Sequence, residues 1–164
     1  MKMRDWGTRP SDVASLFNPA YCAALLNRVA AGYQGSTKKG LPYALAFIAL
    51  PLMLDSRSVS LLPSSAKSRI HTWLLNTPEV VFGFGRKAKS MAPFAREAIA
   101  FGMQNKILGY VAGMRLAPID SKGIKQWQKM PENVALGRQA QLLGKLLSQV
   151  KDVPTAFVFF GVRP

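Results

Sequence analysis

Apolar residues recur at helical spacing along most of the chain, and this pattern predicts a mainly helical protein. A first helix is expected over residues 19–33, because Asn18 is a good N-cap and a proline follows it in the first helical position. The segment Leu41–Leu54 is almost entirely apolar, which predicts a buried helix that Pro51 bends or ends. Residues 132–150 place leucines on one face and basic residues on another, so they predict an amphipathic helix.

The middle of the chain, residues 66–118, predicts a winged-helix-like unit. The elements expected there are helices over residues 66–75, 77–91 and 93–105 and strands over residues 107–111 and 114–117. Thr77-Pro78 and Pro93 mark the starts of the second and third helices. Three helices followed by a hairpin is the order of a winged helix, in which the helix over 93–105 would be the recognition helix.

Both ends of the chain are predicted to lack helices. Residues 1–11 predict an extended arm, and the apolar tail over residues 155–164 has strand propensity. Burying one large apolar side chain contributes roughly 1.5–3 kcal/mol, so the phenylalanines of the tail favour a buried position. The tail therefore docks either on its own domain or on a partner protein, and the sequence leaves both open. The candidates for docking on a partner are Phe157, Phe159, Phe160 and Val162.

The length of 164 residues fits a single domain over residues 1–164, mainly α with a small β-hairpin and a winged-helix-like core. Apolar residues make up 49% and charged residues only 18% of the chain, which predicts a globular protein with apolar surface for partner subunits. Cys22 is the only cysteine, which excludes an internal disulfide and fits a reducing cytosol. No signal peptide is visible, and Leu41–Leu54 is shorter than the ~20 residues that span a bilayer. We therefore expect a cytoplasmic protein.

Few residues of the chain can carry covalent chemistry. It contains one histidine and one cysteine, and its carboxylates form no pair at helical spacing. His71 has no partners at metal-ligand spacing, and Gly83 and Gly85 do not follow a predicted strand, as a nucleotide-binding motif would require. Cys22 lies on an Ala- and Leu-rich helix, where a buried apolar role is expected. The sequence thus predicts no catalytic residue, no cofactor and no bound metal, and the protein is not expected to be an enzyme.

The charge of the chain is strongly positive, with 22 Lys and Arg against 8 Asp and Glu and a net charge of +14. Such an excess favours binding to polyanions. Residues 120–131 predict a polar loop in which lysines surround Trp127, a combination that suits phosphate contact and base stacking. A solvated basic face is the alternative interpretation. The candidates for nucleic-acid contact are Arg86, Lys87, Lys89, Lys122, Lys125, Trp127, Lys129, Arg138 and Lys145. We expect contact with phosphates rather than base-specific recognition, because the helix over 93–105 carries few long polar side chains.

Several segments, taken in order, carry a resemblance to a known family. They are Asn18-Pro19 with the helix that ends at Tyr33, the stretch FIALPLML over 47–54, Trp73-Leu74 before Asn76, the helix at Pro93, the hairpin, Leu143-Gly144-Lys145 and the closing FGVRP over 160–164. In this order they resemble the middle component of bacterial three-component ABC systems, of which Lamassu-type defence systems are one kind. The resemblance implies a non-enzymatic subunit that holds an SMC/Rad50-like ABC ATPase together with an effector, often a nuclease, and lies near DNA.

Two other functions stay open on the sequence. A winged helix would suit a free-standing DNA-binding regulator. The basic amphipathic helix over 132–150 would suit a peripheral membrane protein, although the accessory subunit without membrane contact is the function we expect.

Overall fold

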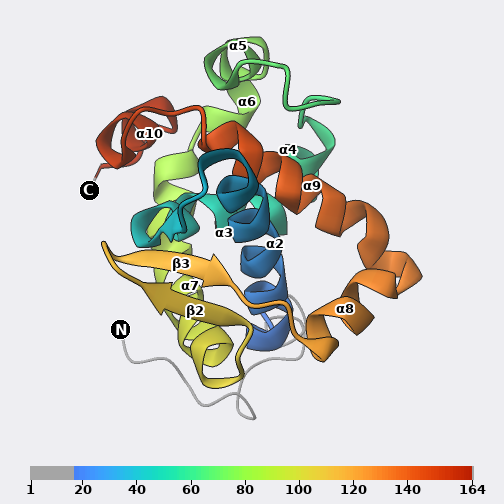
Figure 1. Cartoon of the computed structure of the whole chain (residues 1–164). Helices are drawn as coiled ribbons and strands as arrows, with labels where there is room; N and C mark the ends of the chain where they lie inside the picture. Colours follow the sequence, from blue (N-terminus) through green and yellow to red (C-terminus); the bar gives the residue numbers. More distant parts are fainter. Residues whose placement is uncertain (1–16, 164) are drawn as a thin grey trace.

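The computed structural model describes residues 17–163, so the arm predicted over residues 1–11 lies outside the described residues. In chain order the elements are α2 (Pro19–Thr37), β1 (Leu41–Pro42), the 3-10 helix η2 (Tyr43–Leu45), α3 (Ala46–Leu54), α4 (Ser56–Ser60), α5 (Ile70–Asn76), α6 (Pro78–Val81), α7 (Phe84–Gln104), β2 (Leu108–Val111), β3 (Arg115–Pro118), α8 (Lys122–Lys129), α9 (Pro131–Leu147) and α10 (Val153–Phe159). They form one domain of helices around a shared apolar core, with a small antiparallel sheet on one side (Figure 1). The predicted fold class, mainly α with a small β element, is confirmed.

Helix α2 runs through the middle of the domain and packs most extensively on α9 and α7 (Figure 1). It begins where the sequence predicts, because the Asn18 Oδ1 atom accepts a hydrogen bond from the backbone N–H of Ala20 at 2.9 Å. It continues past Tyr33 to Thr37 and ends at Lys38, which adopts the left-handed conformation with φ 61°. The helix is therefore longer than predicted, and it supplies one wall of the core along most of its length.

Helices α2 and α9 cross at two glycines, Gly32 on α2 and Gly144 on α9. A Cβ atom placed on Gly32 would lie 2.9 Å from the Cα atom of Gln141, and one on Gly144 would lie 2.8 Å from the backbone nitrogen of Tyr33. Both positions face the backbone of the other helix rather than a side chain that could move away. The two backbones touch at this crossing because glycine leaves no side chain between them.

The hairpin of β2 and β3 is confirmed, with Tyr110 opposite Leu116, but the sheet has a third strand that the sequence analysis missed. Strand β1 pairs antiparallel with β3, placing Leu41 opposite Leu116, and the strand order is β1-β3-β2. The prediction of one helix over Leu41–Leu54 is therefore wrong at its start, where the chain is a strand and then a 3-10 turn. Pro51 lies inside α3 and does not end it, because the surrounding side chains are fully buried in the core.

The helix boundary predicted at Pro93 is wrong, since Pro93 lies inside the continuous helix α7. One face of α7 is buried from Phe84 to Gly102, and this burial outweighs the ~3 kcal/mol that an interior proline costs. The second predicted helix is correspondingly reduced to the short α6, which has a proline in its first turn as predicted. Helix α7 joins the second half of the helix predicted over 77–91 to the helix predicted over 93–105. The winged-helix arrangement and its recognition helix are therefore not confirmed.

Two segments near the C-terminus are helices where the sequence analysis predicted a loop and an extended tail. Helix α8 lies in the predicted loop and is capped by Ser121, whose hydroxyl oxygen accepts from the N–H of Ile124 at 3.3 Å. Helix α10 lies in the tail and is capped by Asp152, whose carboxylate accepts from the N–H of Thr155 at 2.8 Å. The amphipathic helix predicted over 132–150 is confirmed as α9, and no helix within residues 17–163 is long and apolar enough to cross a membrane.

Candidate partner-binding and nucleic-acid surfaces

The apolar tail docks on its own domain. The Phe160 side chain is 0% exposed, and its ring lies 5.4 Å from that of Phe84 and 6.4 Å from that of Trp73, measured between ring centroids. A Cβ atom on Gly85 would lie 2.6 Å from the carbonyl oxygen of Gly161, so the backbone of the tail rests directly on the start of α7. Of the two positions left open for the tail, Phe160 therefore takes the one on its own domain, whose core covers its side chain.

The tail ends in a glycine cap that explains its turn back onto α7. Gly161 has φ 65°, a conformation that favours glycine, and its N–H donates to the carbonyl of Val158 at 3.1 Å. The N–H of Val162 donates to the carbonyl of Phe157 at 2.9 Å, which completes the pair of hydrogen bonds of a Schellman motif. Phe157 and Val162 are half-buried against the core, so they contribute to this docking in cis.

The remaining candidate of the tail, Phe159, lines an apolar groove on the surface. The groove lies between α5, α6 and α10, and its lining residues are His71, Leu74, Leu75, Pro78, Val81, Phe82 and Phe159. Phe82 is 90% exposed and Leu75 is 77% exposed, which is unusual for two large apolar side chains that lie next to each other. An exposed apolar groove of this kind is typical of a surface that another protein covers.

Phe82 is held in this exposed position by the backbone. Phe82 has φ −60° and ψ 119°, and Gly83 has φ 70° and ψ 4°, which are the dihedral angles of the two central residues of a type II turn. The second of these positions requires a positive φ, which glycine adopts at no steric cost. The turn therefore directs the Phe82 side chain away from the domain between α6 and α7.

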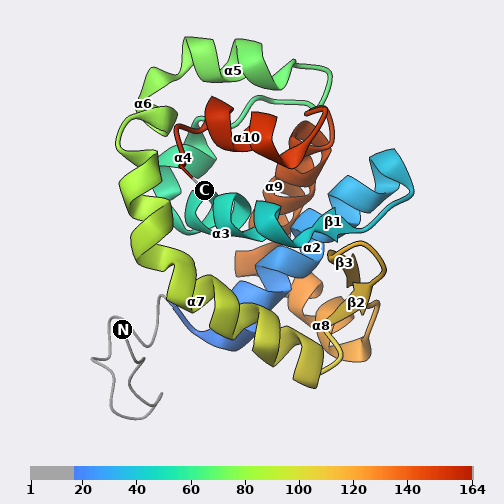
Figure 2. The same cartoon turned by 90° about the vertical axis from the view of Figure 1, so that its left-hand side faces the viewer.

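The basic candidates do not form one surface. Lys87 on α7 lies 2.7 Å from a carboxylate oxygen of Asp55, so its charge is already paired, whereas Arg86 and Lys89 are exposed. Figure 2 shows the start of α7 and helix α8 on opposite sides of the molecule. The three lysines of α8 thus lie apart from the two exposed residues of α7, and the remaining pair is carried by a third helix, α9.

The pairing of Lys87 with Asp55 affects the pKa of the carboxyl group. Burial of Asp55 raises its pKa, but the hydrogen bonds from Lys87 and Ser58, the positive charge of Lys87 and the N–H of Arg57 together outweigh burial. The net result is a pKa of Asp55 below its usual value. This ion pair joins the start of α4 to α7 and serves the fold rather than contact with a phosphate.

Helix α8 separates its lysines from Trp127. Lys122, Lys125 and Lys129 are exposed at positions that share one face, and Lys125 lies 3.5 Å from the exposed carboxylate of Asp120. Ile124 and Trp127 point to the other side, where the Trp127 ring lies 6.1 Å from that of Tyr21. The interpretation of Trp127 as a base-stacking residue among the lysines is not supported, because its ring packs against the core.

A buried polar network attaches α2 to the hairpin. Asn27 is 0% exposed, and its side-chain amide donates to the carbonyls of Ile107 at 2.7 Å and Ile119 at 3.0 Å. Its Oδ1 atom accepts from the Arg28 guanidinium at 2.6 and 2.9 Å. Burial lowers the pKa of Arg28, which the negative charge of Asp120 partly opposes. With its amide oxygen turned toward Arg28, Gln128 accepts a hydrogen bond from that guanidinium at 2.8 Å, which fastens α8 to the same network.

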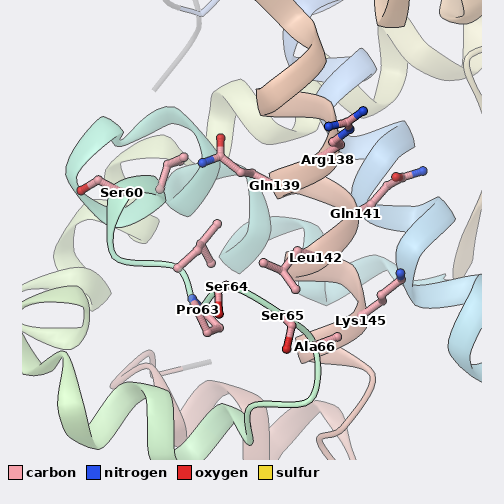
Figure 3. Close-up of a pocket in the computed structure, with 12 residues that line it drawn as sticks. Ser60, Pro63, Ser64, Ser65, Ala66, Arg138, Gln139, Gln141, Leu142 and Lys145 are labelled. Atoms are coloured by element: carbon pink, nitrogen blue, oxygen red, sulfur yellow. The ribbon is translucent and has the colours of Figure 1, made fainter.

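The basic residues of α9 border a polar groove between α9 and the segment from Val59 to Ala66. Figure 3 shows Gln139 pointing toward α4, whereas Arg138 and Lys145 lie along the opposite edge of the helix. Both basic side chains are exposed, and they point away from the serines of the groove rather than toward them (Figure 3). The groove therefore does not gather the two charges into a cradle for a phosphate.

The residues with reactive side chains lie apart from one another. Cys22 is 1% exposed, as expected for a small apolar core residue, and burial together with the charge of Glu97 raises the pKa of its thiol to about 12. His71 is exposed at the apolar groove. Among residues 17–163, no three His, Cys, Asp or Glu side chains gather as ligands for a metal ion.

An exposed apolar groove together with basic surface is typical of a protein that binds other macromolecules. The family model described as ABC-three component (ABC-3C) system Middle Component 3 matches residues 6–164. The chain belongs to this family, which confirms the resemblance to the middle component of three-component ABC systems. No curated protein and no solved structure shows significant similarity to it.

Proposed function

We propose that this protein is a non-enzymatic cytoplasmic subunit that joins an SMC/Rad50-like ABC ATPase to an effector, a nuclease, in a Lamassu-type defence complex. The observation that carries the proposal is the family match over residues 6–164, because a middle component of a three-component system has partner subunits. The exposed groove that contains Phe82 and Leu75 supports the proposal, since it offers an apolar surface for such a partner.

The lysine face of α8 is the best candidate for contact with DNA in this complex. Its three lysines are spaced at i, i+3 and i+7, so they lie in a row of roughly 10 Å along the helix. Such a row allows each of the three lysines to contact a phosphate of the backbone. The contact would be independent of base sequence, because lysine ammonium groups meet phosphates as point charges.

Co-expression with the neighbouring reading frames tests the assembly. We expect the protein to co-elute in fixed stoichiometry with a large ATPase and an effector in size-exclusion chromatography. Elution of the protein by itself, as a dimer that selects one sequence from random DNA, would instead support a free-standing regulator and refute the proposal.

A charge variant tests the DNA contact. Replacing Lys122, Lys125 and Lys129 by Gln should weaken binding to any duplex and reduce the slope of log K against log salt by about 2.7, or ~0.9 per phosphate contact. The matched control replaces Lys89, Arg138 and Lys145 by Gln and removes the same charge from the other two groups. Equal changes in slope for both variants would show that net charge, and not the face of α8, sets the affinity.

A further inference from the structure

We propose that the apolar groove between α5, α6 and α10 binds an acidic segment of one partner subunit, whose apolar side chains pack on Phe82, Leu75 and Phe159. This inference rests on the proposed function, which supplies the partner, and it deepens that function by naming the contact surface and the chemistry of the segment. The groove is distinct from the lysine face of α8, which lies at the far end of the domain (Figure 2).

Two exposed apolar side chains supply most of the surface that a partner could cover at the groove. Phe82 is 90% exposed and Leu75 is 77% exposed, so most of the surface of each is free to be covered. The type II turn at Phe82-Gly83 directs the Phe82 side chain outward before any partner binds. An aromatic side chain has only two rotatable bonds, so it loses little conformational entropy on binding, which suits an anchor residue in an interface.

The docked tail completes the groove and makes it stable. Phe159 contributes to one wall, and its neighbour Phe160 is buried between Phe84 and Trp73. The wall is therefore attached to the core and does not depend on a partner for its position. This explains how a tail that packs in cis can still form part of a surface for binding in trans.

The charges around the groove identify its occupant. A second hollow, which shares Pro78 and Phe82 with the groove, is lined by two basic residues, Arg57 and Lys87, and two acidic ones, Asp55 and Glu79. Asp55 is already paired with Lys87. Within residues 17–163 neither Arg57 nor Arg86 forms an ion pair with a carboxylate. Gly85 rests on Gly161, which in turn faces Val81 of the groove, so the neighbouring Arg86 and Arg163 add positive charge to this side of the groove.

This positive border favours an acidic protein segment over a second copy of the chain. Two copies that met at this groove would bring like charges together, and each carries a net charge of +14. Nucleic acid has the complementary charge, but the aliphatic lining of Leu74, Leu75 and Val81 offers its phosphates no hydrogen-bond donor. An apolar segment flanked by Asp or Glu matches both the groove and its border.

The test uses the full-length protein with the two co-expressed partner subunits. Phe82→Ser and Leu75→Ser should each release one subunit and lower its affinity, measured by biolayer interferometry with that purified subunit, by about 30-fold or more, as for an interface hot spot. The matched control is Val158→Ser, which removes an apolar side chain that is 75% exposed on α10 but does not line the groove. All three positions are exposed, so the variants should fold like the wild-type protein.

The acidic character of the segment is tested separately. The Kd of the wild-type protein for the released subunit should rise with salt, and the pair Arg57→Glu and Arg86→Glu should weaken binding at low salt. A Kd that does not depend on salt would refute the acidic occupant. If the wild-type protein is a dimer and Phe82→Ser converts it to a monomer, the groove binds a second copy of the chain instead. If Phe82→Ser abolishes DNA binding, the groove binds a nucleic acid instead.

The result separates this inference from the proposed function. Wild-type levels of both subunits on the Phe82→Ser and Leu75→Ser proteins would refute the groove as the binding surface while leaving the assembly intact. Failure of the wild-type protein itself to bind either subunit would refute both.

Discussion

The crossing of α2 and α9 provides the most direct test of the fold, because two glycines of α2 differ only in what they face. Gly32 faces the backbone of α9, where an added Cβ atom would lie 2.8 Å from the carbonyl carbon of Gln141. Gly35 lies in the same helix, and an added Cβ atom there would have no atom within 4 Å. The substitutions Gly32→Ala and Gly35→Ala therefore change the helix propensity equally and the packing unequally.

The expected effects have opposite signs. Carbon atoms pack at about 3.5–4.0 Å, so the methyl group that Gly32→Ala introduces would force the helices apart by roughly 1 Å. Such overpacking costs about 1–3 kcal/mol, and we expect the upper part of this range because a backbone cannot move like a side chain. For a domain of this size, a change of 1 kcal/mol in the free energy of unfolding shifts Tm by about 2–4 °C. A cost of about 2–3 kcal/mol for Gly32→Ala should therefore lower Tm by roughly 4–12 °C. Gly35→Ala should stabilise the protein by about 0.5–1 kcal/mol and raise Tm by roughly 1–4 °C.

Thermal and urea unfolding followed by circular dichroism at 222 nm measure both quantities, and the wavelength reports the helices directly. Similar changes in the free energy of unfolding for the two variants would refute the reasoning, because they would mean that helix propensity rather than the close crossing decides. Gly144→Ala provides an independent check from the other helix, since its Cβ atom would meet the backbone of Val29 and Tyr33.

Three further predictions concern single side chains. Phe160→Ala should lower the free energy of unfolding by about 3–5 kcal/mol in urea titrations, because the ring is completely buried, whereas little change would show that the tail does not dock. Cys22, with a pKa of about 12, should not react with a thiol reagent at pH 8 until the protein unfolds; rapid labelling of the folded protein would contradict its burial. The lowered pKa of Asp55 stabilises the fold above its ordinary value of 3.8, and this contribution is lost as pH falls through the folded value. Asp55→Asn should therefore be less stable than wild type at neutral pH, and the difference should shrink in acid; a constant difference would exclude the ion pair as its cause.

Local signals in the sequence predicted the elements whose ends they mark. Asn18 and the proline after it start α2, the Thr77-Pro78 pair starts α6, and the regular leucine spacing predicts α9. The signals failed where packing of a whole helix face opposes them. Pro93 is a strong local signal for a helix start, but the buried face of α7 is continuous on both sides of it, so the helix continues.

In the tail, by contrast, local capping signals were correct, and the strand propensity of the phenylalanines led to the wrong prediction. Its phenylalanines favour a strand, yet Asp152 and Pro154 form a helix start and Gly161 forms a helix end. These three residues would have predicted α10 if the capping positions had been considered before strand propensity. Strand β1 gave no such signal, because its pairing with β3 joins residues that lie far apart in the sequence.

The candidate surfaces were predicted unevenly for a related reason. The exposure of the lysines on α8 follows from their charge, so the sequence was sufficient to find them. The exposure of Phe82 and Leu75 depends on which elements cover them in the folded chain, and apolar residues are expected in the core by default. The one local signal was the Phe-Gly pair, which is compatible with a type II turn that holds its first residue outward.

The position of the two proposed surfaces has a consequence for assembly. Helices α5 and α6, which line the groove, and helix α8, which carries the lysines, lie at opposite ends of the domain (Figures 1 and 2). Substitutions at sites that share no contacts usually add in free energy within about 0.5 kcal/mol. Phe82→Ser should therefore weaken partner binding and leave DNA affinity unchanged, and the Lys122, Lys125 and Lys129 variant should do the reverse. If either variant weakens both partner binding and DNA binding, the two ligands meet on a shared surface. The protein would then join them at one site rather than hold them apart.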